Sequence, residues 1–197
     1  IIKGQVSFKN STIDDQVLLK SDGFPTYHLA AVVDDYLMKI THVIRAEEWL
    51  PSTPKHIMLY DYFGWDKPEF AHVPVILGPD KAKLSKRHGA VSLLEYRDQG
   101  YLAEAMMNYL AFLGWNPKTD QEIFNREELI AVFDLAKVNK ANPIFDITKL
   151  NWMNGQYIKK LQTKELAARL NLGASVDIKV VKLTQERMEK LSDFESL

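Results

Sequence analysis

The stretch ITHVIRAEEWLPSTPKHIMLYDYFGWDKPEFAHVPVIL, residues 40–77, decides the fold of the first part of the chain. It begins and ends with short apolar runs rich in β-branched residues, at residues 40–45 and 72–77, and these runs predict buried strands. Between them lies a helical segment with Pro54 in its first turn and Gly64 where the helix should stop. A strand, a helix and a second strand in this order predict a parallel βαβ unit, so the expected fold class is α/β.

The flanking segments differ from each other in their patterns. Upstream, residues 5–8 and 16–19 alternate in polarity and predict two strands, and residues 25–39 predict a helix that starts at a proline. From Ser92 onward the apolar residues take helical spacing. The expected helices there occupy residues 92–100, 102–114, 125–134, 146–161 and 163–172. The last stretch, residues 176–197, predicts a short β-branched run followed by a charged amphipathic helix.

Composition narrows the class of protein before any motif is considered. The chain has 197 residues, a formal net charge of −1 and no cysteine. A near-neutral chain is not a generally polycationic nucleic-acid binder, although it can carry a local basic patch. Disulfides and thiolate metal sites are excluded, and no apolar run approaches the roughly 20 residues that a membrane helix needs. We therefore expect a globular, cytoplasmic protein rather than a membrane protein.

Positive charge concentrates in PDKAKLSKRHGAVSL, residues 79–93. Lys83 and Lys86 flank a serine in this segment, and Gly89 would allow a ligand to approach the backbone closely. Cationic groups that converge on a triphosphate would stabilise the charge of the leaving pyrophosphate in a transition state. The chain lacks both standard glycine-rich phosphate loops, and a solvated surface run is the alternative that this motif alone leaves open.

Arg45 ends the first predicted strand of the βαβ unit, and the basic segment follows the second. Both should therefore face the same crevice, beyond the carboxyl ends of the parallel strands. The guanidinium of Arg45 could make a bidentate pair with the carboxylate of a ligand, whereas a structural ion pair with Glu48 or Asp34 is the alternative. Tyr27 could offer its hydroxyl to a polar ligand, or it could be a core aromatic residue.

The remaining candidates are expected to be structural. The histidines lack the spacing of a metal site, so packing or hydrogen bonding is predicted for His28, His42 and His72. The core is the expected place for Trp115, Phe145 and Trp152.

Three stretches together resemble one family. SDGFPTYHLAAVVDDYLMKITHVIRAEEWLPSTPKHIMLYDYFGW, residues 21–65, and KLSKRHGAVSLLEYRDQGYLAEAMMNYLAFLGW, residues 83–115, resemble the later half of the catalytic domain of bacterial-type glutamyl-tRNA synthetases, which are class I enzymes. PIFDITKLNWMNGQYIKK, residues 143–160, resembles the helical region that contacts the acceptor side of tRNA. The resemblance implies part of a Rossmann-type parallel-sheet catalytic domain at residues 1–95, including the KLSKR loop. An α-helical stem-contact subdomain is implied at residues 96–197.

The resemblance also implies the residues of the site. The segment KLSKR matches the mobile lysine loop that closes on ATP, with Lys83 and Lys86 as the catalytic residues. The ATP-binding positions implied in this way are Glu48, Lys83, Leu84, Ser85, Lys86 and Arg87. The glutamate-binding positions are Tyr27, His28, Ala31 and Arg45, of which Arg45 matches the arginine that pairs with the side-chain carboxylate of glutamate. Mg²⁺ would accompany ATP, but no residue of this chain is identified as a metal ligand.

The implied activity is that of a glutamate–tRNA ligase, which activates L-glutamate with ATP and transfers it to the 3′ end of tRNA. Arg45 favours glutamate over glutamine, because a guanidinium left facing a neutral amide would be costly. The N-terminal His-x-Gly-His motif and the anticodon-binding domain of the family have no counterpart in these residues. We therefore expect an internal fragment that is inactive by itself. Its expected form is a cytoplasmic monomer that contacts the acceptor stem of tRNA and no membrane.

Two alternatives stay open at this point. One is a truncated paralogue that glutamylates a modified tRNA base, although the long helical part argues against it. The other is a non-catalytic tRNA-binding module, although a near-neutral charge gives few phosphate contacts for strong RNA binding. Whether glutamine tRNA is also charged depends on an anticodon-reading region that these residues do not include.

Overall fold

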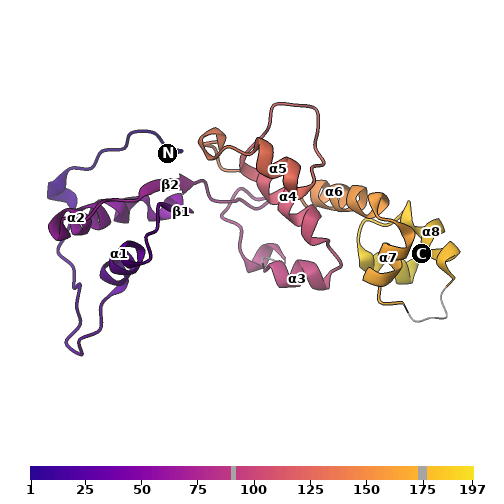
Figure 1. Ribbon diagram of the computed structural model, residues 1–197, viewed down its shortest axis with the longest axis horizontal. Helices are drawn as coiled ribbons and strands as arrows, with labels where there is room; N and C mark the ends of the chain where they lie inside the picture. The colour runs from indigo at the N-terminus through magenta and orange to yellow at the C-terminus, as the bar shows by residue number, and fades with distance from the viewer. Residues whose placement is uncertain (90–91, 173–176) are drawn as a thin grey trace. The chain divides into compact units, whose positions relative to one another are not determined.

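The computed structural model describes residues 1–89, 92–172 and 177–197. The chain forms two compact units. Unit 1 comprises Ile1–Val75 and Leu135–Lys140, and unit 2 comprises Ile76–Asp134 and Ala141–Leu197. Figure 1 labels the helices and strands of both units.

Unit 1 contains the expected βαβ unit. Its helices and strands are α1 (Tyr27–Leu37), β1 (His42–Ala46), α2 (Thr53–Phe63) and β2 (Glu69–Val73). Short 3-10 helices occupy Asn10–Thr12, Glu47–Ser52 and Leu135–Lys137. β1 pairs with β2 in parallel, and this register places Arg45 opposite His72. The predicted parallel pairing with a crossover helix is confirmed.

Local sequence signals explain where α2 begins and ends. Pro54 lies in its first turn, where a missing N–H costs no hydrogen bond. Gly64 takes the left-handed conformation with φ 67° and ends the helix, as predicted. Between α1 and α2, a small core forms around Val32, Leu59 and Tyr60. The core of unit 1 is therefore assembled from the two helices.

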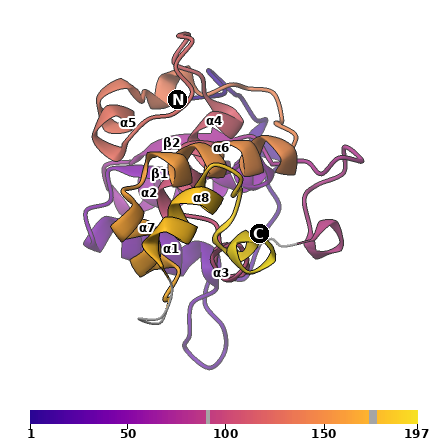
Figure 2. The ribbon, with the colours of Figure 1, turned by 90° about the vertical axis from the view of Figure 1, so that its right-hand side faces the viewer.

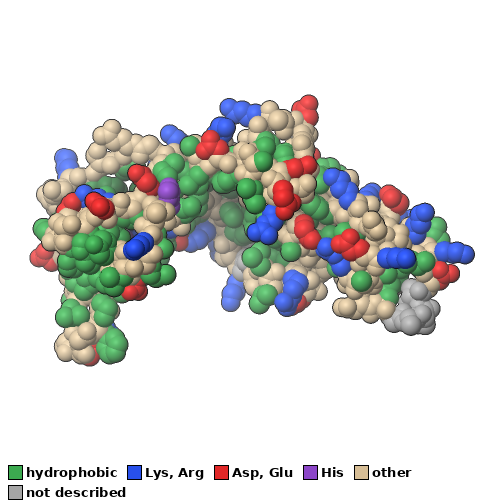
Figure 3. Space-filling model, viewed as in Figure 1, with side chains coloured by type: hydrophobic (Ala, Val, Ile, Leu, Met, Phe, Trp, Pro, Cys, Tyr) green, Lys and Arg blue, Asp and Glu red, His purple; other side chains and the backbone are tan. Residues whose placement is uncertain are grey.

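Three sequence expectations for unit 1 are wrong. Residues 5–8 and 16–19 form no strand among the described residues, and Leu19 makes only an isolated bridge to Pro25. An alternating pattern becomes a strand only when a partner strand completes its hydrogen bonds. β1 is not buried, because Ile44 is 55% exposed, and hydrophobic side chains are visible over the surface of unit 1 in Figure 3. The strand expected at residues 72–77 ends at Val73, because the next residue, Pro74, has no N–H for the ladder.

Unit 2 is helical, as expected from Ser92 onward. Its helices are α3 (Leu93–Asp98), α4 (Ala103–Gly114), α5 (Arg126–Val132), α6 (Ile147–Lys160), α7 (Thr163–Arg169) and α8 (Ile178–Gln185). Further 3-10 helices occupy Lys86–His88 and Leu191–Ser196. The β-branched run near residue 178 is helical rather than extended, because Asp177 caps α8 by accepting a hydrogen bond from the N–H of Lys179.

The core of unit 2 has two hydrophobic clusters, and α4 and α6 contribute residues to both. α4 packs against α6, and α7 packs against α8 (Figures 1 and 2). The first cluster contains Tyr96, Tyr101, Met106, Tyr109, Leu150 and Met153. The second contains Leu102, Ala105, Ile158, Leu166, Val181 and Met188. The buried amide of Asn154 on α6 binds the start of α4, because its Oδ1 accepts the N–H of Leu102 at 2.8 Å.

The aromatic residues of unit 2 divide into buried and exposed ones. Trp115 is 1% exposed and Phe145 packs against the first cluster, as predicted. Trp152 was expected in the core, but it is 39% exposed. The ammonium group of Lys149 lies over its ring, 4.1 Å from the centroid, so this indole stays at the surface in a cation–π contact.

The two compact units do not coincide with the expected division at residue 95. The KLSKR segment belongs to unit 2 by its contacts, because unit 2 begins at Ile76.

No helix within the described residues is long and apolar enough to cross a membrane.

Candidate functional site

Arg45 lies near the carboxyl end of β1, and two neutral side chains hold its guanidinium. Its Nε donates a hydrogen bond to Nε2 of His72 at 3.1 Å. Its Nη2 donates a hydrogen bond to Oγ1 of Thr53 at 2.9 Å. The alternative considered from the sequence was an ion pair with Asp34 or Glu48. Among the described residues of unit 1, Arg45 is instead hydrogen-bonded to these neutral side chains.

The charge of Arg45 is only partly compensated. Burial lowers the pKa of its guanidinium, and Tyr27 and Asp35 oppose this effect by favouring the charged form. Burial also raises the pKa of the Asp35 carboxyl, and the neighbouring Asp34 raises it further. A half-buried cation whose hydrogen-bond partners are neutral is suited to bind an anionic group from a ligand.

Tyr27 and His28 belong to an aromatic cluster in the same unit. The ring of Tyr27 lies 5.3 Å from the ring of His28 and 5.3 Å from the ring of Trp49, measured between centroids. His28 shares a hydrogen bond of 2.9 Å with His56, from Nδ1 to Nε2. Tyr27 itself is 53% exposed. The alternative interpretation, that Tyr27 is a core aromatic residue, is therefore wrong. About half of the Tyr27 residue is therefore accessible to a ligand.

The histidines near Arg45 are held neutral. Burial, then the charge of Arg45, lowers the pKa of His56 to about 4. The same two causes lower the pKa of His72 to about 4. Burial also lowers the pKa of His28. Hydrogen bonding by His28 and His72, as predicted, is confirmed, and at neutral pH these residues add no positive charge beside the guanidinium.

Sequence reasoning did not assign three of these residues to the site. Neither Thr53 nor His56 is predicted as a site residue from the sequence. His72 could have been found from the parallel pairing, since it stands opposite Arg45 in the register. The sequence signal for Thr53 and His56 is their position in the first turn of α2, directly after the 3-10 helix that follows β1. Ala31, the other predicted glutamate-binding residue, is half-buried in α1.

The basic segment begins with a tight turn in unit 2. The N–H of Gly78 donates to the carbonyl of Ala82 at 2.8 Å, and Lys81 takes the left-handed conformation with φ 61°. Leu77 and Lys83 then form an antiparallel bridge. The N–H of Leu84 donates to the carbonyl of Ile76 at 2.9 Å. This first half of the segment therefore has a defined backbone conformation.

The second half of the segment presents the predicted phosphate-binding side chains. Lys83, Lys86 and Arg87 are exposed, whereas Leu84 and Ser85 are half-buried. Gly89 has φ 104°, a conformation that favours glycine, and its N–H donates to the carbonyl of Lys86 at 3.3 Å. The exposed cations suit a polyphosphate ligand.

The predicted site residues thus fall into two groups. Tyr27, His28, Ala31, Arg45 and Glu48 belong to unit 1, and the residues from Lys83 to Arg87 belong to unit 2. That both groups face one crevice stays a prediction. Among the described residues, no group of three or more His, Cys, Asp or Glu side chains could hold a metal ion.

Comparison with known proteins places the chain in a family. Residues 1–152 match the catalytic-domain model of the class I tRNA synthetases for glutamate and glutamine (E and Q). The chain belongs to this family. The resemblance noted in the sequence and the α/β class with a parallel sheet are confirmed.

The similar proteins are glutamate–tRNA ligases. The chain is 52% identical over 211 aligned residues to the glutamate–tRNA ligase of Dehalococcoides mccartyi, which covers all of this chain and 43% of that protein. It is 57% identical over 169 residues to the ligase of Chloroherpeton thalassium, covering 85% of this chain and 34% of that one.

A solved structure agrees with these relatives. The crystal structure of a glutamate tRNA ligase from Elizabethkingia meningosepticum in complex with its amino acid matches with a TM-score of 0.86. Its sequence identity is 41%, and the match covers 99% of this chain and 44% of the other. The chain therefore spans less than half the length of the family members that it matches.

Proposed function

We propose that this chain is the central part of a glutamate–tRNA ligase. The observation that carries the proposal is the guanidinium of Arg45, which is half-buried and hydrogen-bonded to the neutral side chains of His72 and Thr53. A cation in this state favours a ligand with a carboxylate and disfavours a neutral amide. The relatives at 52% and 57% identity are ligases for glutamate, which is the ligand with that carboxylate.

The reaction has two steps in which bonds are exchanged. An oxygen of the α-carboxylate of glutamate attacks the α-phosphate of ATP, and pyrophosphate leaves. A hydroxyl of the terminal adenosine of tRNA then attacks the activated carbonyl, and AMP leaves. Both steps depend on the positioning of the substrates and the stabilisation of charge.

The residues of unit 1 have the glutamate role in this proposal. Arg45 binds the side-chain carboxylate, and Tyr27, with His28 and Ala31 on the same helix, lines the amino-acid pocket. The exposure of the Tyr27 ring supports this assignment. Glu48 lies in the 3-10 helix that follows β1 and is assigned to the ATP side of the pocket.

The KLSKR segment has the ATP role. Lys83 and Lys86 would stabilise the charge on the leaving pyrophosphate, and Ser85, Leu84 and Arg87 would complete the loop around ATP. The exposure of both lysines supports this assignment, because a bound triphosphate must reach them. When bound, Mg²⁺ would supply further charge neutralisation at the phosphates.

The helical part has the tRNA role. In the proposed division, residues 1–95 are catalytic and residues 96–197 contact the acceptor stem of tRNA. We expect a cytoplasmic monomer. The relatives' match extends through this helical part, which favours a tRNA ligase over a truncated paralogue that modifies a tRNA base.

The test is tRNA-dependent ATP–pyrophosphate exchange by a full-length ligase that contains these residues. With glutamate, the wild-type protein should exchange, and with glutamine it should not. Lys86→Ala and Arg45→Ala should each slow the exchange about a hundredfold, as expected for the loss of one charged group at a transition state or ligand. Lys9→Ala removes the same charge from an exposed position of unit 1 that belongs to neither group of site residues, and it serves as the matched control. Exchange that depends on glutamine, or wild-type rates in both variants, would contradict the proposal.

A further inference from the structure

The hydrogen bonds of Arg45 to His72 and Thr53 lie on one side of its guanidinium. An arginine has a side-on pair of donors, Nε–H and one N–H of Nη2, and an end-on pair, on Nη1 and Nη2. His72 accepts from Nε at 3.1 Å and Thr53 accepts from Nη2 at 2.9 Å. The side-on pair is therefore occupied by protein groups.

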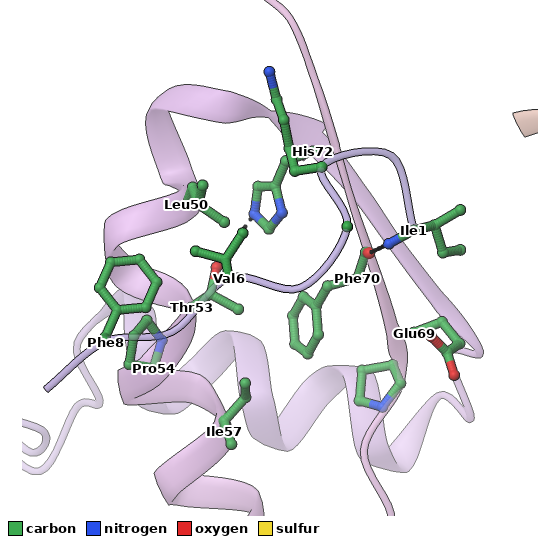
Figure 4. Close-up of a pocket in the computed structure, with 13 residues that line it drawn as sticks. Ile1, Val6, Phe8, Leu50, Thr53, Pro54, Ile57, Glu69, Phe70 and His72 are labelled. Atoms are coloured by element: carbon green, nitrogen blue, oxygen red, sulfur yellow. Dashed lines mark hydrogen bonds between the residues drawn. The ribbon is translucent and has the colours of Figure 1, made fainter. Parts of the chain in front are cut away.

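The two acceptors are fixed by the fold. His72 is 4% exposed and Thr53 is 7% exposed. The parallel register sets His72 opposite Arg45, and Thr53 is the first residue of α2. Oγ1 of Thr53 and Nε2 of His72 are also 3.2 Å apart, and Figure 4 shows the two side chains facing each other beside a cavity of about 280 Å³. Side chains held this firmly can orient a neighbouring group.

The ring of Phe70 adds a third restraint. The guanidinium carbon of Arg45 lies 5.7 Å from the centroid of this ring, which is within the range of a cation–π contact. Phe70 and His72 lie on the same strand, β2, two residues apart. The plane of the guanidinium is therefore restrained by a face contact and by hydrogen bonds at one edge.

His72 acts as an acceptor and not as a second cation. Its Nε2 receives the hydrogen bond from Arg45, so its proton belongs on Nδ1. Burial and the charge of Arg45 lower its pKa to about 4, which keeps the ring neutral at pH 7. The charge of Arg45 is thus oriented without being neutralised.

We propose that His72 and Thr53 are positioning residues that occupy the side-on donors of Arg45 and direct its end-on donors to the substrate carboxylate. The inference rests on the proposed function, because it takes glutamate as the ligand of Arg45. It goes further in naming the N–H groups that bind the carboxylate and the residues that aim them. Neither His72 nor Thr53 touches the substrate in this arrangement.

The test measures KM and kcat in tRNA-dependent ATP–pyrophosphate exchange by the full-length ligase. Thr53→Val removes the hydroxyl and keeps the shape of the side chain, and Thr53→Ser keeps the hydroxyl. Thr53→Val should raise KM for glutamate about tenfold, as expected for one hydrogen bond to a charged group. KM for ATP should change less than about twofold, and Thr53→Ser should restore the wild-type KM for glutamate.

A double-variant cycle separates positioning from general damage. In an Arg45→Lys background, Thr53→Val should produce no further rise in KM for glutamate, because the group that Thr53 orients is absent. A further tenfold rise in that background would overturn the proposal. If Thr53→Val loses its thermal unfolding transition, Thr53→Ala and His72→Asn are measured against the same criterion.

The outcomes distinguish this inference from the proposed function. Absence of glutamate-dependent exchange in the wild-type ligase would overturn both. An unchanged KM for glutamate in Arg45→Lys would overturn the assigned role of Arg45 and with it the positioning. A raised KM in Arg45→Lys with an unchanged KM in Thr53→Val would overturn the positioning alone.

Discussion

Mild acid should destabilise unit 1 through His56 and His72. Their side chains are 3% and 4% exposed, and burial followed by the charge of Arg45 lowers both pKa values from 6.5 to about 4. A histidine with a lowered pKa binds fewer protons in the folded state than in the unfolded state. Its contribution to stability is therefore complete above pH 6.5 and is lost as the pH falls toward 4.

The magnitude follows from the size of the shift. One pKa unit corresponds to about 1.4 kcal/mol, so each histidine should lose about 2 kcal/mol of unfolding free energy between pH 6.5 and pH 5. Together they should lose about 4 kcal/mol, which is a large part of the ordinary stability of a domain. Burial raises the pKa of Asp35, so protonation of its carboxyl favours the folded state and opposes the effect of the two histidines.

The assay is urea unfolding of the chain at several pH values from 7 to 5, followed by tryptophan fluorescence. His56→Asn and His72→Asn should each flatten the dependence of the unfolding free energy on pH by about half. His42→Asn changes an exposed histidine of β1 and should keep the wild-type slope. A wild-type loss below about 1 kcal/mol across this window, or unchanged slopes in both buried-histidine variants, would refute the reasoning.

Three further predictions concern packing, backbone geometry and the lysine loop. Leu150→Ala, at a fully buried position, should lower the unfolding free energy by about 3 kcal/mol in urea, whereas Leu183→Ala, at a position that is 76% exposed, should change it by less than about 0.5 kcal/mol. Gly100→Ala should cost about 2–4 kcal/mol in thermal unfolding, because φ is 90° and the new Cβ would lie 2.7 Å from the backbone nitrogen of Ser192. Gly23→Ala, with φ 85° and open space around it, should cost only about 1 kcal/mol. Lys83→Ala should slow ATP–pyrophosphate exchange in the full-length ligase with little change in KM for glutamate. A change in KM for glutamate without a slower exchange would contradict the role of Lys83 at ATP.

Several features of the fold were predictable from short stretches of sequence. Pro54 and Gly64 mark the ends of α2, because their backbone preferences act within a single turn. Ser92 with Glu95 and Asn125 with Glu128 form capping boxes that begin α3 and α5. The collinear resemblance to glutamyl-tRNA synthetases was also readable from the sequence, and the family match over residues 1–152 confirms it.

Other features depend on which segments meet in space. The alternating residues 5–8 do not form a strand, because no described segment pairs with them. Trp152 faces outward although its type favours the core, because Lys149 on the same helix covers its ring. Local patterns cannot report such outcomes, since each depends on a partner or on the face of a packed helix.

The sequence alone was enough to predict the βαβ order of residues 40–77, the family, and Arg45 and the KLSKR lysines as the candidate charged groups. Only the tertiary structure decided how Arg45 is held, because His72 and Thr53 reach it from a second strand and a helix. His72 is 27 positions from Arg45 in the chain, and Thr53 is 8 positions away. These hydrogen bonds therefore form only when the strand register and the start of α2 are set. Charge is a property of one side chain, whereas its orientation depends on the packing of several elements.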